Sequence, residues 1–196
     1  MAFLREGFET KSTDRYMKFV AGENRFRVLS EAIDGYLYWL NAEGQLVPRD
    51  EIGGKGSKPV RVRTLEEASK KTEGSQYDCK QFIAFVVWNY TSKAMEILEI
   101  TQKGIMRSLE GLSRSEDWGD PTAYDIIIDK SGEKMATEYM VRPIPPKEFA
   151  GDVTGLSKIN LEALYEGGDP FLDTGVAENV SNKDFEEIKD EVPFKE

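Results

Sequence analysis

The stretch KQFIAFVVWNY, residues 80–90, decides the fold class. It is a continuous apolar run rich in β-branched and aromatic side chains, which favour strands, and it predicts a central strand of a sheet. Residues 91–93, TSK, predict a turn. The next residues, 94–101, alternate apolar and polar side chains in the period of a strand, so we expect them to return as the hairpin partner of the central strand.

Further strands are predicted on both sides of this hairpin. Residues 23–40 read as two strands around a turn at Asp34-Gly35, because an Asp-Gly pair between apolar strands is a strong hairpin signal. Other elements follow from periodicity and from proline and glycine positions. They are a short strand at 60–63, a short helix at 65–74, a second helix after Thr101 with Ile105, Met106, Leu109 and Leu112 on one stripe, a hairpin at 124–144 and a further short helix within 156–168.

This order predicts a mainly β protein with one or two helices. A helix between an early meander and a final hairpin suits an OB-type five-stranded Greek-key barrel with an additional hairpin. An unrelated α+β sandwich would give the same list of elements. We expect residues 1–148 to form the body, as a domain that binds single-stranded DNA if the OB interpretation holds, and residues 149–196 to form a flexible acidic tail.

Composition excludes several kinds of site. The 196 residues contain one cysteine, Cys79, and no histidine, so neither a structural zinc site nor a Ser-His-Asp or Cys-His nucleophile can be built. A single cysteine allows no intrachain disulfide and fits a reducing cytoplasm. No apolar run reaches the length of a membrane helix, and the N-terminal residues lack the pattern of an export signal. We therefore expect a cytoplasmic protein without a membrane contact, metal or cofactor.

Charge is distributed unevenly along the chain. The net charge is −10, and residues 149–196 hold twelve Asp or Glu and four Lys, a balance of −8. The preceding 148 residues are nearly neutral, with 24 acids and 22 bases. Two of their segments are basic: residues 11–27 and residues 58–71 each contain five bases and two acids. A near-neutral body with basic patches and an acidic tail is the pattern that a function has to explain.

Aromatic and basic side chains alternate along the predicted strands. Every nucleobase has a π-face, so aromatic rings beside a cationic groove bind single strands without reading sequence. The alternative interpretation is that these rings belong to the core. Alternation places Arg25 and Arg27 opposite Phe26 and Val28, so we expect both arginines to be exposed. The candidate DNA-binding residues are Arg25, Arg27, Tyr36, Tyr38, Trp39, Arg61, Arg63, Lys80, Trp88 and Tyr90.

A catalytic interpretation would have to use carboxylates. Asp117, Asp120, Asp125 and Asp129 lie close together in the sequence around the last hairpin and could hold Mg²⁺ for phosphodiester cleavage. The competing interpretation is that they occupy a turn and solvated strand ends. We favour that interpretation and predict no catalytic residue. A third possibility is a protein that binds only other proteins, through its tail.

Three blocks carry a resemblance to a known family: residues 22–39, GENRFRVLSEAIDGYLYW, residues 85–105, FVVWNYTSKAMEILEITQKGI, and residues 118–146. They resemble single-stranded-DNA-binding proteins of tailed phages and prophages. The resemblance implies an OB-fold body with an acidic C-terminal tail, acting in DNA replication, recombination or repair. It implies a site around Arg25, Arg27, Trp39, Arg61, Arg63 and Trp88. Some relatives bind a zinc ion, but this chain lacks the residues that would hold one.

The C-terminal residues 190–194 have a resemblance of their own. Asp190, Glu191, Val192, Pro193 and Phe194 look like the acidic run and Ile-Pro-Phe ending of bacterial single-stranded-DNA-binding proteins. In those proteins the phenylalanine is the last residue, and partners hold its ring and its terminal carboxylate. Here Lys195 and Glu196 follow it and displace the carboxylate. The resemblance implies docking of replication or recombination proteins on the tail, and a homo-oligomer is compatible with the sequence.

Overall fold

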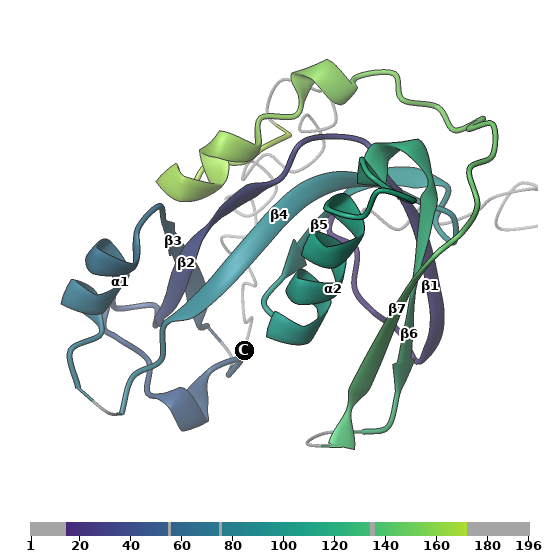
Figure 1. The fold of residues 1–196 in the computed structure, drawn as a ribbon. Helices are drawn as coiled ribbons and strands as arrows, with labels where there is room; N and C mark the ends of the chain where they lie inside the picture. The colour runs from purple at the N-terminus through teal and green to yellow at the C-terminus, as the bar shows by residue number, and fades with distance from the viewer. Residues whose placement is uncertain (1–14, 55, 75, 134–135, 172–196) are drawn as a thin grey trace, which may run out of the picture.

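A computed structural model describes residues 15–54, 56–74, 76–133 and 136–171, and within them seven strands form one antiparallel sheet (Figure 1). The strand order is β3-β2-β4-β1-β6-β7, with β5 added on β4. The strands are β1 (Gly22–Val28), β2 (Ile33–Leu40), β3 (Lys58–Val62), β4 (Lys80–Asn89), β5 (Ala94–Ile100), β6 (Asp125–Ser131) and β7 (Glu138–Pro143). The α-helices are α1 (Leu65–Lys71) and α2 (Lys103–Ser113). Short 3₁₀ turns are η1 (Arg49–Glu51), η2 (Pro121–Ala123), η4 (Leu156–Lys158) and η5 (Leu161–Glu166).

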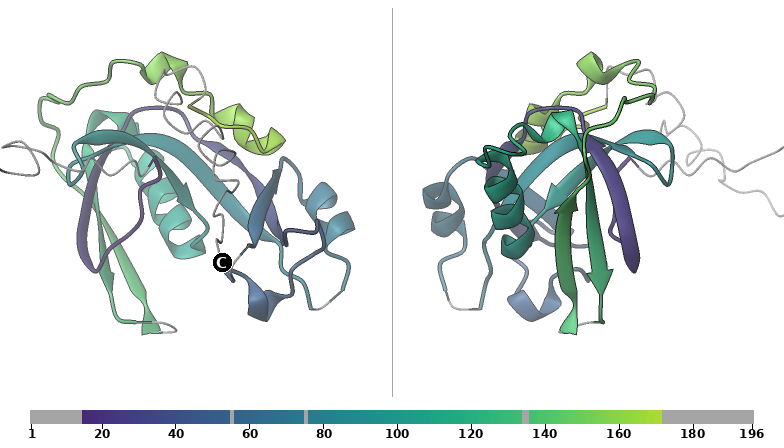
Figure 2. Two further views of the ribbon diagram at one scale, coloured as in Figure 1. Left: turned by 180° about the vertical axis from the view of Figure 1, so that it is seen from behind. Right: turned by 45° about the vertical axis from the view of Figure 1, so that its right-hand side comes forward.

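Strand β4 is the centre of the sheet, as its apolar sequence predicts. Along one edge it pairs with β5 over most of its length, from Ile83 to Asn89. Along the other edge its first half pairs with β2 and its last three residues pair with β1. The sheet therefore divides at β4 into two branches, β2–β3 and β1–β6–β7. Figure 2 shows β7, β6 and β1 side by side, with α2 beside them.

Both faces of β4 are buried, which explains why its apolar run is continuous rather than alternating. On one face, called here the helix face, Phe85 and Val87 pack with Ile105 and Leu109 of α2. On the opposite face, the strap face, Phe82, Ala84 and Val86 pack beneath a C-terminal segment, residues 156–171, that we call the strap. Figure 1 shows the strap above β4 and α2 below it. The side chains with which the strap completes this second core are Leu161, Leu164 and Phe171.

The coarse prediction of a mainly β chain with one or two helices is confirmed, but the predicted turn at Asp34-Gly35 is wrong. Both residues lie inside β2, opposite Ile83 and Phe82 of β4. The glycine is required by close packing: a Cβ there would overlap the Val62 carbonyl oxygen and lie 3.1 Å from the Phe82 ring. β1 and β2 pair with β4 rather than with each other, and residues 29–32 connect them.

Two boundaries also differ from the sequence predictions. Helix α1 begins with a capping box, in which Thr64 and Glu67 exchange hydrogen bonds, and it ends at Lys71. Helix α2 follows Gln102 rather than a Thr101 cap. The predicted tail starts at residue 149, yet the strap, residues 156–171, lies against the sheet because apolar side chains such as Leu161 and Leu164 are buried there. No helix in the described residues is long and apolar enough to cross a membrane.

Candidate nucleic-acid interface

The strand register places six of the ten candidate residues on the strap face, and side-chain contacts bring two more to it. Arg27 of β1 pairs with Trp88 of β4, and Leu37 of β2 pairs with Lys80 of β4 and with Arg61 of β3. Residues that pair directly across neighbouring strands point to the same face of the sheet, so side chains on the four strands can be assigned to one face or the other. The residues on this face within strands are Arg25, Arg27, Trp39, Arg61, Lys80 and Trp88, and Tyr90 and Arg63 follow directly after β4 and β3. Tyr36 and Tyr38 point to the helix face, where Tyr38 is 7% exposed.

At the β1 branch, two arginines and a tyrosine converge on one buried carboxylate. Arg27 Nε donates to Asp125 Oδ1 at 2.6 Å, and the Tyr90 hydroxyl donates to the same oxygen at 2.9 Å. Arg25 Nε donates to the other oxygen at 3.0 Å. The Arg25 guanidinium also lies over the Tyr90 ring, 4.4 Å from its centroid. Arg27 is only 5% exposed, so the expectation that both arginines are exposed is wrong for Arg27.

The Asp125 carboxylate is held in its ionised form. Burial alone raises the pKa of Asp125, but the hydrogen bonds from Arg25, Arg27 and Tyr90 outweigh it, and the net pKa lies below the ordinary value. Burial, followed by the bond to Asp125, raises the pKa of the Tyr90 hydroxyl. The cluster therefore keeps fixed charges near neutral pH, as a structural ion network does.

Trp88 is packed by protein rather than open to a ligand. Its indole meets the Phe149 ring edge-on, with centroids 6.0 Å apart. The Arg27 guanidinium lies over the same Phe149 ring at 5.4 Å, and Arg27 Nη2 donates to the Lys147 carbonyl at 3.2 Å. Phe149 lies outside the predicted strands, so strand alternation does not identify it. Together these contacts close the strap face above Arg27.

At the β3 branch the cations are more accessible. The Arg61 side chain is 13% exposed and pairs with Glu99 at 2.6 Å, but the Arg63 side chain is 58% exposed. Arg63 pairs with Glu162 of the strap at 2.6 Å and lies over the Tyr165 ring, 4.2 Å from the centroid. Lys80 lies 5.3 Å from the centroid of the half-buried Trp39 ring. At this end of the sheet, two cations therefore lie over aromatic rings, and their side chains are partly exposed to solvent.

Sequence reasoning missed the part that α1 plays at this end. Lys70 and Lys71 of α1 line a hollow of about 430 Å³ with Arg61, Arg63 and Tyr165. Tyr38, Val62 and Glu67 complete the lining. The signal was present in the basic segment 58–71, to which both lysines belong. Neither lysine lies on a strand, and the candidates were selected from strands.

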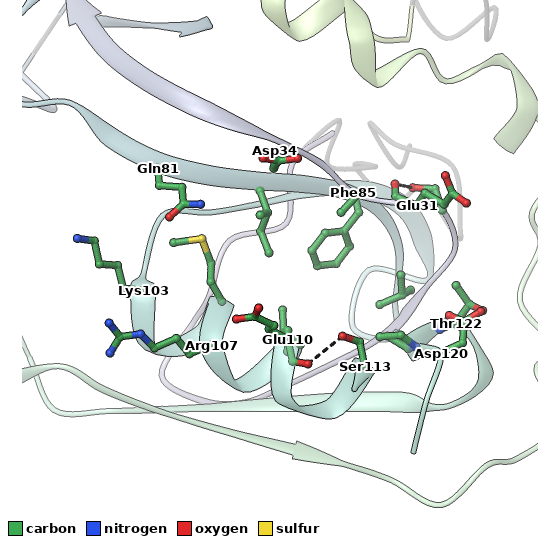
Figure 3. A pocket seen from close by; sticks show the side chains of 17 residues that line it. Glu31, Asp34, Gln81, Phe85, Lys103, Arg107, Glu110, Ser113, Asp120 and Thr122 are labelled. Atoms are coloured by element: carbon green, nitrogen blue, oxygen red, sulfur yellow. Dashed lines mark hydrogen bonds between the residues drawn. The ribbon is translucent and has the colours of Figure 1, made fainter. Parts of the chain in front are cut away.

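Another hollow, larger than the one beside α1, has the opposite electrostatic character. It is a groove of about 690 Å³ between α2 and strands β2 and β4, shown in Figure 3, with an apolar floor that includes Phe85. Its acidic lining residues are Glu31, Asp34, Glu110 and Asp120, against the two cations Lys103 and Arg107. Phosphate groups are repelled by such an acidic excess, so this groove is not a candidate site for a nucleic-acid backbone.

The four aspartates of the catalytic alternative are engaged separately. Asp125 belongs to the arginine cluster, Asp129 accepts from Arg142 at 2.7 Å, and Asp120 accepts from the Thr122 N–H at 2.9 Å. Asp117 is exposed after α2. In the part of the chain that the structure describes, no three His, Cys, Asp or Glu side chains gather as a metal site would require. The geometry gives the magnesium hypothesis no support.

The tail residues Asp190, Glu191, Val192, Pro193 and Phe194 lie outside the described residues. Their proposed role rests on sequence.

Comparison with known proteins gives one informative relative. The chain is 28% identical over 148 residues to a probable ssDNA-binding protein of Escherichia phage T5. The match covers 68% of this chain and 56% of that protein, so the chain spans little more than half the length of the relative. No family model and no solved structure matches the chain.

Proposed function

We propose that this protein binds single-stranded DNA without reading its sequence, without an enzymatic step, and that it acts in phage DNA replication, recombination or repair. One observation carries the proposal: the register, together with the contacts of Tyr90 and Arg63, brings eight of the ten predicted basic and aromatic residues to one face of the sheet. The name of the T5 relative points to the same ligand. The seven-stranded sheet is compatible with an OB-type body, a fold that commonly binds single strands.

The contacts differ in role within this proposal. The accessible cations Arg25, Arg63 and Lys80 would meet phosphates, with side chains 39%, 58% and 45% exposed. The rings that remain half-buried beside them, Trp39 and Tyr90, would stack on bases, each worth about 1–3 kcal/mol by alanine substitution. Arg27, Arg61 and Trp88 would support these residues from within the sheet, because protein groups already occupy them.

The acidic end of the chain has two proposed roles. Val192, Pro193 and Phe194 among acids form a short docking peptide for replication or recombination proteins, in which the ring and the neighbouring charges make the contact. A tethered acidic segment also competes with DNA, since its local concentration is set by the tether and reaches about millimolar. Removing residues 175–196 is expected to tighten binding of an oligo(dT) at low salt. Equal affinity of the truncated and full-length proteins would contradict the competition.

The test of the proposed function is a fluorescence titration. Tryptophan emission of the full chain is followed while poly(dT) or a duplex of equal length is added, across a salt series with and without Mg²⁺. We expect preferential binding of the single strand, a steep salt dependence and no cleavage. Cleavage that requires Mg²⁺ would support the nuclease alternative, and an absence of binding to either DNA would leave a protein that binds only proteins.

A further inference from the structure

The geometry points to a second DNA contact that lies off the strands: we propose that Lys70 and Lys71 of α1, with Arg63 of the β3 branch, hold the phosphate backbone of single-stranded DNA. This inference rests on the proposed function and adds to it a specific site on a helix. The three cations line the same hollow of about 430 Å³. The ligand class is a phosphodiester, which needs positive charge and N–H donors but no base-specific contact.

Helix α1 presents its lysines from a fixed position. The Thr64–Glu67 capping box defines its first turn, and Ala68, which is 0% exposed, anchors it on the body. Lys70 and Lys71 form its last turn, and both are exposed. A short helix held at its start and middle therefore places two ammonium groups beside β3 at little cost in ordering.

The hollow is cationic, and its carboxylate is already engaged. Four of its eight lining residues are Lys or Arg, and Glu67 is the single acid among them. The Glu67 side chain accepts from the Thr64 N–H at 3.2 Å as part of the cap. Tyr165 lies beneath the Arg63 guanidinium, which leaves the edge of that planar group for a phosphate.

The ion pairs that surround the hollow are weak enough to be exchanged for phosphate. Lys70 pairs with Glu66, but the two side chains are 69% and 78% exposed. Arg63 and Glu162 are 58% and 54% exposed. Pairs this exposed contribute little to stability, because water screens them. Among the described residues Lys71 forms no ion pair, whereas the better-buried Arg61–Glu99 pair is expected to persist.

A matched control lies on the other helix. Lys103 and Arg107 of α2 are also exposed, but they line the acidic groove. The double variants K70A/K71A and K103A/R107A remove the same charge from helical positions, and alanine preserves helix propensity in both. Circular dichroism and urea denaturation establish that each variant is folded as stably as the parent before DNA is added.

The experiment measures the affinity of the full chain and both double variants for fluorescent dT oligomers across a salt series. For K70A/K71A we expect the slope of log K against log salt to fall by about 1.4 and affinity near 0.1 M salt to drop roughly ten-fold. K103A/R107A should retain the parental slope. R63A/K70A/K71A should lose about 0.7 more of the slope than K70A/K71A.

The outcomes separate this site from the function on which it rests. If the parent binds dT and K70A/K71A binds it with the parental slope, the α1 site is wrong and the proposed function stands. If both double variants weaken binding equally, net charge rather than position is responsible and the site is again wrong. If the parent does not bind single strands at all, the proposed function itself fails and the site with it.

Discussion

The sheet carries two arginine pairs with the same spacing, Arg25 and Arg27 on β1 and Arg61 and Arg63 at β3, and the structure uses them differently. On β1 both arginines converge on Asp125, which is 2% exposed. At β3 the arginines pair with separate carboxylates, and Arg63 remains largely exposed. Alternating arginines on a strand therefore do not by themselves mark a binding surface.

The difference arises from the residue across the ladder. Asp125 lies directly opposite Arg27 in the β1–β6 register, on the same face and inside the sheet. Arg63 lies beyond the last residue of β3, at the edge of the sheet, where only the strap covers it. A buried charge must keep its partner, since an uncompensated ion in the interior is costly, whereas an exposed pair is readily exchanged. Arg27 is thus expected to act in stability and Arg63 in binding.

The largest expected effect is that of Asp125→Ala on the β1 branch. It leaves Arg27 buried without its carboxylate, so the free energy of unfolding should fall by about 3–5 kcal/mol. Urea denaturation followed by circular dichroism measures the change. Asp129→Ala is the control, because it breaks the more exposed pair with Arg142 and should cost less than about 1 kcal/mol. Equal losses in the two variants would abolish the distinction between buried and exposed pairs.

The β3 branch depends on the apolar strap, which carries Glu162 and Tyr165 to Arg63. Leu164 is 2% exposed in the core of the strap face, and Leu164→Ala is expected to reduce stability by about 2–5 kcal/mol. Thermal and urea unfolding measure the loss. Val153→Ala, at a residue that is 39% exposed, should have almost no effect. A strap that only rests on the sheet would make the two variants indistinguishable.

Acid should weaken the β1 cluster. The pKa of Asp125 is lower in the folded chain than in the unfolded chain, where it is near 3.8. The stability from its ionised form is therefore complete above about pH 4 and is lost as the pH falls towards the folded pKa. Urea midpoints between pH 7 and pH 3 should fall more steeply for the parent than for Asp125→Asn. Parallel curves would show that other carboxylates determine the acid response.

The smallest expected effect on stability is that of Arg63→Ala. Its pair with Glu162 is more than half exposed on both sides, so the free energy of unfolding should hardly change. Its salt slope for single-stranded DNA should nevertheless fall by about 0.7. A variant that loses stability and retains the parental slope would contradict the role assigned to Arg63.

The sequence predicts the centre of the fold better than its edges. The apolar run of β4, its hairpin with β5 and the β6–β7 hairpin are local patterns, and all three are observed. The Asp34-Gly35 turn failed because Gly35 is needed for contact with residues far along the chain, which a dipeptide signal does not encode. A short helix is predicted within residues 156–168, but its packing on the sheet was missed for a related reason: the burial of Leu161 and Leu164 depends on β4, which is far away in the sequence.

The candidate interface was predicted in part, because local patterns show which residues share a face but not what packs on that face. Alternation correctly separated Arg25 and Arg27 from Phe26 and Val28, but it assigned the polar face to solvent. Only the three-dimensional pairing with Asp125 shows that Arg27 is interior. Lys70 and Lys71 belong to a basic segment visible in the sequence, yet their approach to Arg63 requires the packing of α1 against β2 and β3.

The strap also affects how the chain folds during its synthesis on the ribosome. Its Tyr165 hydroxyl donates to the Asp34 carbonyl across 131 residues, so this contact forms only after nearly all of the described chain has left the ribosome. Until then a nascent chain that has already paired β2 with β4 displays Leu37, Phe82 and Val86 to solvent. Contacts of such long range form slowly, and exposed apolar strands associate with one another. During synthesis, the nascent chain is therefore expected to be prone to aggregation until the strap packs on the sheet.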